Sequence, residues 1–168
     1  MLYFPPVRYK PALKGLVVGM KIFIFTLLLL MGRPSFAQSV YGRYMQPVKT
    51  VLARMNGSAS FEKVCDLMRL GHGFRYKTEG LYVATAPAIT EAMQSGDCKA
   101  KALWLAAELN DTSVCFVVGM LHSNSKTNHA WLVWRGQWIL DCTNTRWPIP
   151  ISDIHTGRDY IPVLELER

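Results

Sequence analysis

The stretch Gly96-Asp97-Cys98-Lys-Ala-Lys-Ala-Leu-Trp-Leu-Ala-Ala-Glu-Leu-Asn110 predicts a helix that carries a cysteine in its first turn. Its alanines and leucines are good helix formers, and its apolar residues recur with a period near 3.6. Asp97 is a preferred N-cap residue, and Gly96 allows a sharp turn just before it. A thiol here lies beside unpaired backbone N–H groups and the positive end of the helix dipole, which both favour the thiolate. The alternative is a small buried cysteine that only packs.

Helices are predicted before and within this region, and strands after it. The predicted helices span residues 42–56, Phe61–Leu70 (capped by Ser60 and ended by Gly71) and Ala88–Met93, with short extended pieces at 74–76 and 81–83. Period-2 alternation predicts strands at Val114–Leu121, Asn128–Trp134, Gln137–Thr143 and, at a sheet edge, Tyr160–Leu166. Helices followed by antiparallel strands indicate the α+β class.

The turn between the strands at 128–134 and 137–143 determines which of their residues face each other. A two-residue loop would place Arg135 at positive φ, so we predict a three-residue loop, Trp134–Gly136. In that register His129 lies opposite Asp141, with about 5 Å between their Cβ atoms. A carboxylate in an apolar strand costs stability unless it is paired, and a facing histidine is a natural partner.

Cys98, His129 and Asp141 together fit a catalytic triad of nucleophile, acid–base and orienting carboxylate. The cysteine would attack a carbonyl carbon, the histidine would hold the thiolate and protonate the leaving group, and the aspartate would orient the imidazole. The Cys98 backbone N–H is one candidate oxyanion donor. Candidates for the second donor are Tyr82 and Gln94, and Trp131 is a further candidate for binding substrate.

These motifs resemble the transglutaminase-like superfamily, and most closely its bacterial transglutaminase-like cysteine proteinases. The resemblance is carried by Gly96-Asp97-Cys98 with its helix, His129-Ala130-Trp131 and Leu140-Asp141, supported by 74–76 and 86–90, and it covers residues 60–145. It implies a papain-like core, with the cysteine helix packed on an antiparallel sheet, and a Cys-His-Asp triad. One departure is that Lys99 and Lys101 stand where many bacterial relatives carry an acidic pair.

The reaction that the resemblance implies is thiol acyl transfer at an amide. We expect a cysteine peptidase or amidohydrolase that acts on peptide or isopeptide bonds of a protein or peptide substrate, as a monomer without cofactor or metal. The alternatives are cross-linking of an amine, a non-catalytic binding module with the same fold, and a metal site built from Cys98, His129 and Asp141 or Cys142.

Residues 1–37 are typical of a signal peptide, with an apolar run at 22–31 and small residues at 35 and 37 that predict cleavage before Gln38. Met20 is a possible true start, and an uncleaved membrane anchor is the alternative. The expected location is therefore secreted or periplasmic, or membrane-anchored with the domain, residues 38–168, outside the cytoplasm. Five of the 19 Lys and Arg residues and none of the 12 acids lie in 1–37, which leaves 14 − 12 = +2 for the rest and excludes a basic nucleic-acid-binding surface.

The chain has four cysteines and no C-x-x-C pair, which argues against a structural zinc knuckle. If Cys98 is a free nucleophile, at most one disulfide can form among Cys65, Cys115 and Cys142. The sequence does not choose between such a pair and three buried thiols.

Overall fold

The structure is a computed structural model that describes residues 46–80, 85–153 and 160–168, all within one compact unit, Val40–Arg168. The predicted signal segment and the predicted extended piece at 81–83, which includes Tyr82, lie outside the described residues. None of the helices in the described ranges has the length and apolar character that a bilayer crossing requires.

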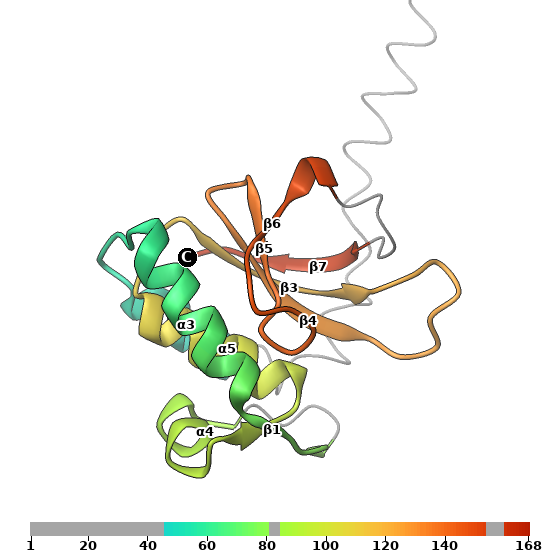
Figure 1. Ribbon diagram of the computed structural model, residues 1–168, viewed down its shortest axis with the longest axis horizontal. Helices are drawn as coiled ribbons and strands as arrows, with labels where there is room; N and C mark the ends of the chain where they lie inside the picture. The colour runs from blue at the N-terminus through green and yellow to red at the C-terminus, as the bar shows by residue number, and fades with distance from the viewer. Residues whose placement is uncertain (1–45, 81–84, 154–159) are drawn as a thin grey trace, which may run out of the picture. The chain divides into compact units, whose positions relative to one another are not determined.

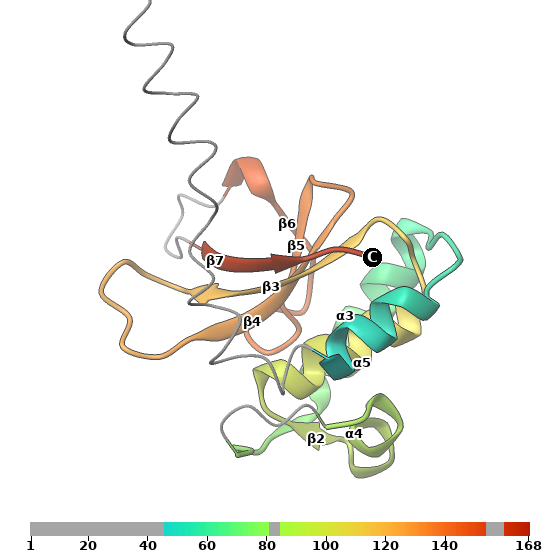
Figure 2. The same cartoon turned by 180° about the vertical axis from the view of Figure 1, so that it is seen from behind.

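A five-stranded antiparallel sheet with helices on one face forms the body of the domain (Figures 1 and 2). The strand order is β6-β5-β4-β3-β7, with bounds β3 Val114–Met120, β4 His129–Trp134, β5 Trp138–Leu140, β6 Ile149–Pro150 and β7 Ile161–Leu166. The helices are residues 46–54, α3 (Phe61–Gly73), α4 (Pro87–Met93) and α5 (Cys98–Leu109), with a short 3-10 helix at Ile151–Asp153. Two short parallel strands, β1 (Arg75–Tyr76) and β2 (Ser95–Gly96), form a separate two-stranded sheet, and β2 directly precedes α5 in the chain. The α+β class is confirmed.

Helix α5 is buried on nearly every side, rather than along one stripe, because it packs against the sheet, α3 and α4. Its predicted cap is present: the Asp97 carboxylate accepts hydrogen bonds from the backbone N–H groups of Lys99 (2.9 Å) and Ala100 (3.1 Å). Gly96 serves close packing, since a Cβ at this position would lie 2.8 Å from the Ala100 Cβ. The start of α5, which carries Cys98, is thus tightly fixed.

Helix α3 begins as predicted but ends later. The Ser60 hydroxyl accepts a hydrogen bond from the Lys63 N–H at 3.2 Å, which confirms the cap. The helix continues through Gly71 to Gly73, so the predicted stop at Gly71 is wrong. Gly71 is buried, and a Cβ there would lie 2.6 Å from the Trp104 ring, so this glycine allows α3 to approach α5 closely.

The β4–β5 hairpin has a tighter loop than predicted. The Gln137 N–H donates to the Trp134 carbonyl at 3.1 Å, and both intervening residues have positive φ, 53° at Arg135 and 61° at Gly136. The Arg135 guanidinium donates to the Ala59 carbonyl at 3.0 Å and lies 4.3 Å from the Trp134 ring, and these contacts offset its unfavourable backbone. The predicted three-residue loop is therefore wrong.

The tighter loop shifts the strand register by two residues. Trp134 pairs with Trp138 and Leu132 with Leu140, so facing numbers add up to 272 rather than the predicted 270. A shift of two keeps every side chain on its predicted face of the sheet. His129 and Asp141 therefore still share a face, although they are no longer directly opposite.

Strand β5 ends at Leu140, before the predicted end at Thr143. The Asp141 carboxylate accepts hydrogen bonds from its own downstream backbone, the N–H groups of Thr143 (3.1 Å) and Asn144 (3.3 Å). This local side-chain bonding folds the chain into a turn instead of continuing the strand. As a result, Asp141 stands at the end of the sheet, beside the first residue of β4.

Candidate active site

Cys98 is the first residue of α5, and its side chain is 7% exposed. The β1–β2 pair lies beside it, because Tyr76 pairs with Gly96, two residues before the cysteine. Cys98 is therefore almost fully enclosed at the start of the helix. All four cysteines are free in the structure; Cys65 is half-buried, and Cys115 and Cys142 are buried.

His129 and Asp141 are hydrogen-bonded, with 2.9 Å between His129 Nε2 and the Asp141 carboxylate Oδ2. Both side chains are buried. With Nε2 donating to the carboxylate, Nδ1 is the ring nitrogen left to interact with Cys98, which together with Asp141 raises the pKa of His129. One imidazole thus interacts with both of the other predicted residues.

The imidazole is held in its protonated form by its two partners. Burial alone would lower the pKa of His129, but hydrogen bonds with Asp141 and Cys98 and the charges of the same two groups raise it to about 9. Burial likewise opposes ionisation of Asp141, yet the bonds from His129, Asn144 and Tyr160 hold its pKa below the usual value. The buried pair is therefore an imidazolium beside a carboxylate at neutral pH.

Two residues that the sequence analysis did not single out also hold Asp141. The Tyr160 hydroxyl donates to Asp141 Oδ2 at 2.9 Å, and the Asn144 side-chain amide donates to the same oxygen at 2.7 Å. Asn144 Nδ2 also lies 3.1 Å from His129 Nε2. A polar run after a strand, Asp141-Cys-Thr-Asn-Thr145, is typical of a turn and is the signal that could have pointed to Asn144.

The candidates for binding substrate lie in different surroundings. Gln94 is exposed at the end of α4, where its backbone has φ 43° and ψ 42°. Trp131 is buried on the outer face of the sheet, where its ring stacks on His129 with centroids 6.1 Å apart. Tyr76, which the sequence analysis placed in the extended piece 74–76 but not in the site, is 56% exposed. Partial burial of its hydroxyl and the charges of Cys98 and Asp97 raise its pKa.

Both lysines in the first turn of α5 have partners in the protein. Lys99 forms an ion pair with Asp97, the helix cap. Lys101 is buried, and its ammonium group donates to the Phe74 carbonyl at 2.6 Å, which ties α5 to the segment leading into β1. Burial lowers the pKa of Lys101, while the charges of Cys142 and Asp141 oppose that change.

The structure is similar to that of LapG from Legionella pneumophila in its calcium-bound form, with a TM-score of 0.50, 14% sequence identity and coverage of 77% of each chain. A candidate cysteine protease from Cytophaga hutchinsonii gives a TM-score of 0.46 and 17% identity, over 76% of this chain and 44% of that one. No family model and no curated protein matches the sequence. The likeness to LapG confirms the predicted resemblance at the level of the fold.

Within the ranges that the structure describes, no group of three or more His, Cys, Asp and Glu side chains is placed to hold a metal ion. The two lysines in the first turn of α5 are engaged with Asp97 and with the Phe74 carbonyl.

Proposed function

We propose that this protein is a cysteine hydrolase that cleaves peptide or isopeptide bonds through Cys98, His129 and Asp141. The observation that carries the proposal is the chain of contacts from Cys98 to His129 and on to Asp141, assembled from the start of α5 and the end of the sheet. The likeness to LapG supports the fold on which this arrangement rests.

The reaction follows from the charges of the three groups. The Cys98 thiolate attacks the amide carbonyl carbon, and the carbonyl oxygen takes the negative charge near the N-terminus of α5. His129 then gives its proton to the leaving nitrogen as the C–N bond breaks. Water attacks the resulting thioester with His129 as base, releasing the acid and restoring Cys98. Asp141 stays ionised and keeps the imidazole oriented.

Hydrolysis is favoured over cross-linking because the domain is small. A transglutaminase must also bind an amine-bearing acceptor, and a domain of this size leaves little room for an elaborate acceptor site. Water needs no such site. The proposed substrate is accordingly a protein or peptide segment whose amide carbonyl reaches Cys98 at the start of α5.

A peptide-library digest tests the reaction class. The purified protein is incubated with a mixed peptide library, with and without a biotinylated primary amine, and the products are identified by mass spectrometry. We expect new peptide termini, absent with Cys98→Ala and present with Cys65→Ala, the matched control at a cysteine outside the site. Incorporation of the amine without new termini would establish cross-linking, and products unchanged by Cys98→Ala would refute the proposal.

We also propose that the domain acts outside the cytoplasm, because residues 1–37 are typical of a signal peptide. The form present in culture medium or periplasm should begin at Gln38. Sequencing the N-terminus of that form distinguishes cleavage from a retained anchor, for which the leader would stay attached to a membrane-bound protein.

A further inference from the structure

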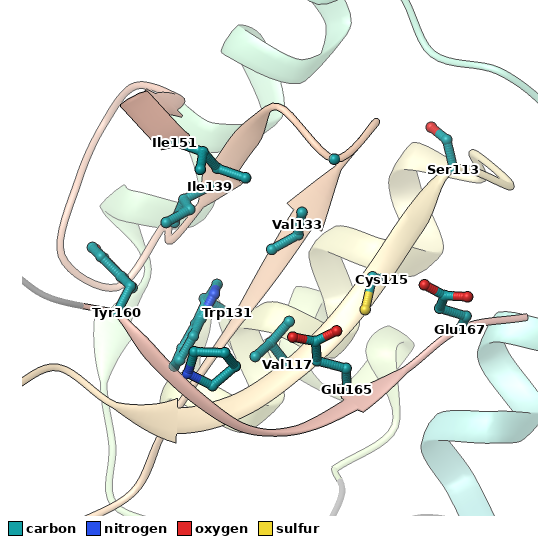
Figure 3. A pocket seen from close by; sticks show the side chains of 12 residues that line it. Ser113, Cys115, Val117, Trp131, Val133, Ile139, Ile151, Tyr160, Glu165 and Glu167 are labelled. Carbon is teal, nitrogen blue, oxygen red and sulfur yellow. The ribbon is translucent and has the colours of Figure 1, made fainter. Parts of the chain in front are cut away.

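A pocket of about 370 Å³ opens on the face of the sheet that α3 and α5 do not cover. Four apolar side chains and one cysteine from β3, β4 and β5 form its floor, and Figure 3 shows them facing one shared space. They are Cys115, Val117, Trp131, Val133 and Ile139. A volume of this size is typical of sites for small organic molecules.

The charged side chains among the described lining residues are both acidic. Glu165 lies on β7 opposite Val117, and Glu167 follows two residues later beside Cys115 (Figure 3). Their charges also act on Cys115 inside the pocket. Burial is the main cause that raises the pKa of Cys115 to about 11, and the charges of the two glutamates raise it further. The pocket therefore combines an apolar floor with a negative rim.

We propose that this pocket binds a small amphipathic cation, an organic amine with a flat apolar body. The apolar body would displace water from the pocket beside half-buried Val133, and the ammonium group would lie at Glu165 and Glu167. Neutral molecules would gain only the apolar contact, and anions would be repelled by the rim. The inference stands apart from the proposed hydrolase activity, since no lining residue belongs to the triad.

Two residues that line the pocket, Trp131 and Tyr160, also contact the candidate active site. The Trp131 ring stacks on His129, and the Tyr160 hydroxyl donates to Asp141 at 2.9 Å. Trp131 and Tyr160 pack edge to face, with centroids 5.3 Å apart. These two buried rings therefore separate the pocket from the imidazole and the carboxylate by one side chain.

Three probes that share an indole ring and differ in charge test the proposal: tryptamine (cation), tryptophol (neutral) and indole-3-propionate (anion). Binding to the purified protein is measured by isothermal titration calorimetry at two salt concentrations. We expect tryptamine to bind most tightly and indole-3-propionate least, with the difference shrinking at higher salt. Equal binding of all three probes, or no binding of tryptamine, would overturn the proposal.

Variants of the rim and the floor locate the binding. Glu165→Gln should weaken tryptamine binding about fivefold, the size expected for one exposed ion pair, and leave tryptophol unchanged. Val133→Trp, which fills the pocket from a half-buried position, should weaken both probes, while Glu91→Gln on exposed α4 is the matched charge control. Tryptamine binding that is indifferent to Glu165→Gln and to Val133→Trp would place the probe elsewhere and reject this site.

Discussion

His129 is the residue on which the candidate site depends, because it contacts both other members of the predicted triad. Its hydrogen bond to Asp141 is 2.9 Å long, and its second contact is Cys98. A buried imidazole without such partners would be neutral at pH 7. The protonation state of this one ring therefore reports whether the assembly exists in solution.

The raised pKa of His129 predicts how activity depends on pH. Hydrolysis needs the imidazolium to protonate the leaving nitrogen, so kcat/KM should fall as the pH rises through about 9, where His129 loses its proton. Because Asp141 contributes to the raised value, Asp141→Asn should move this fall to lower pH. The measurement is a pH profile of kcat/KM for both proteins; identical alkaline limbs would contradict the assignment.

The raised pKa of His129 also makes the folding stability of the domain depend on pH. A histidine whose pKa is raised by folding stabilises the folded state fully below its unfolded value, about 6.5. That contribution is lost as the pH rises through about 9. The stability of the domain and the charge on the candidate acid therefore decline over the same alkaline range.

Asn144 is expected to act as a positioning residue. Its side-chain amide donates to Asp141 Oδ2 at 2.7 Å, and its backbone N–H also bonds to that carboxylate. Asn144→Ala should lower kcat on the order of tenfold, because the aspartate loses a fixed donor, with little change in KM. The matched control is Asn124→Ala, at an exposed loop position. An equal loss in both variants, or a change confined to KM, would argue against the positioning role.

At the scale of the elements, Asp111 joins three segments far apart in the sequence. Its carboxylate accepts hydrogen bonds from the Ala59 N–H (2.8 Å), the Ser113 N–H (2.9 Å) and the Trp134 indole N–H (2.8 Å). Burial would raise the pKa of Asp111, but these bonds lower it to about 2. The ionised Asp111 carboxylate therefore contributes fully to folding stability above about pH 3.9, and this contribution is lost as the pH falls through about 2.

Removing this carboxylate should destabilise the domain strongly. Asp111→Ala leaves buried N–H donors unpaired and should lower the free energy of unfolding by about 3 kcal/mol. Asp66→Ala is the control, because Asp66 pairs with Arg69 on the exposed side of α3 and should cost less than about 1 kcal/mol. Urea unfolding curves measure both, and equal losses would show that Asp111 is not a structural link.

The elements show which local features the sequence could predict. Asp97 and Ser60 cap their helices as expected, because an N-cap bond involves only residues two or three positions apart. The Arg135 loop was not predictable in this way, since its support comes from the Ala59 carbonyl, 76 residues away. The early end of β5 at Leu140 depended on recognising that Asp141 bonds its own downstream backbone.

At the scale of the molecule, the sequence predicted the α+β class, and it predicted that His129 lies beside Asp141, although from a hairpin register two residues off. The two residues still meet because a two-residue shift preserves the face of each side chain, and the turn at Asp141 brings the carboxylate back to His129. The role of Cys98 with this pair stays a prediction. The outer pocket was not predictable, because Glu165 and Cys115 become neighbours only through the β3–β7 pairing.

Comparison of all four thiols in one molecule tests the central claim most directly. The protein is treated briefly with iodoacetamide at mildly acidic pH, and labelling of each cysteine is quantified by peptide mapping in the parent protein and in His129→Ala. Burial raises the pKa of Cys115 to about 11 and that of Cys142 to about 12, so both should stay unlabelled, and half-buried Cys65 serves as the reference. We predict that Cys98 reacts faster than Cys65 despite being more buried, and that this advantage disappears in His129→Ala. Labelling of Cys98 no faster than that of Cys65, or unchanged by His129→Ala, would contradict the account.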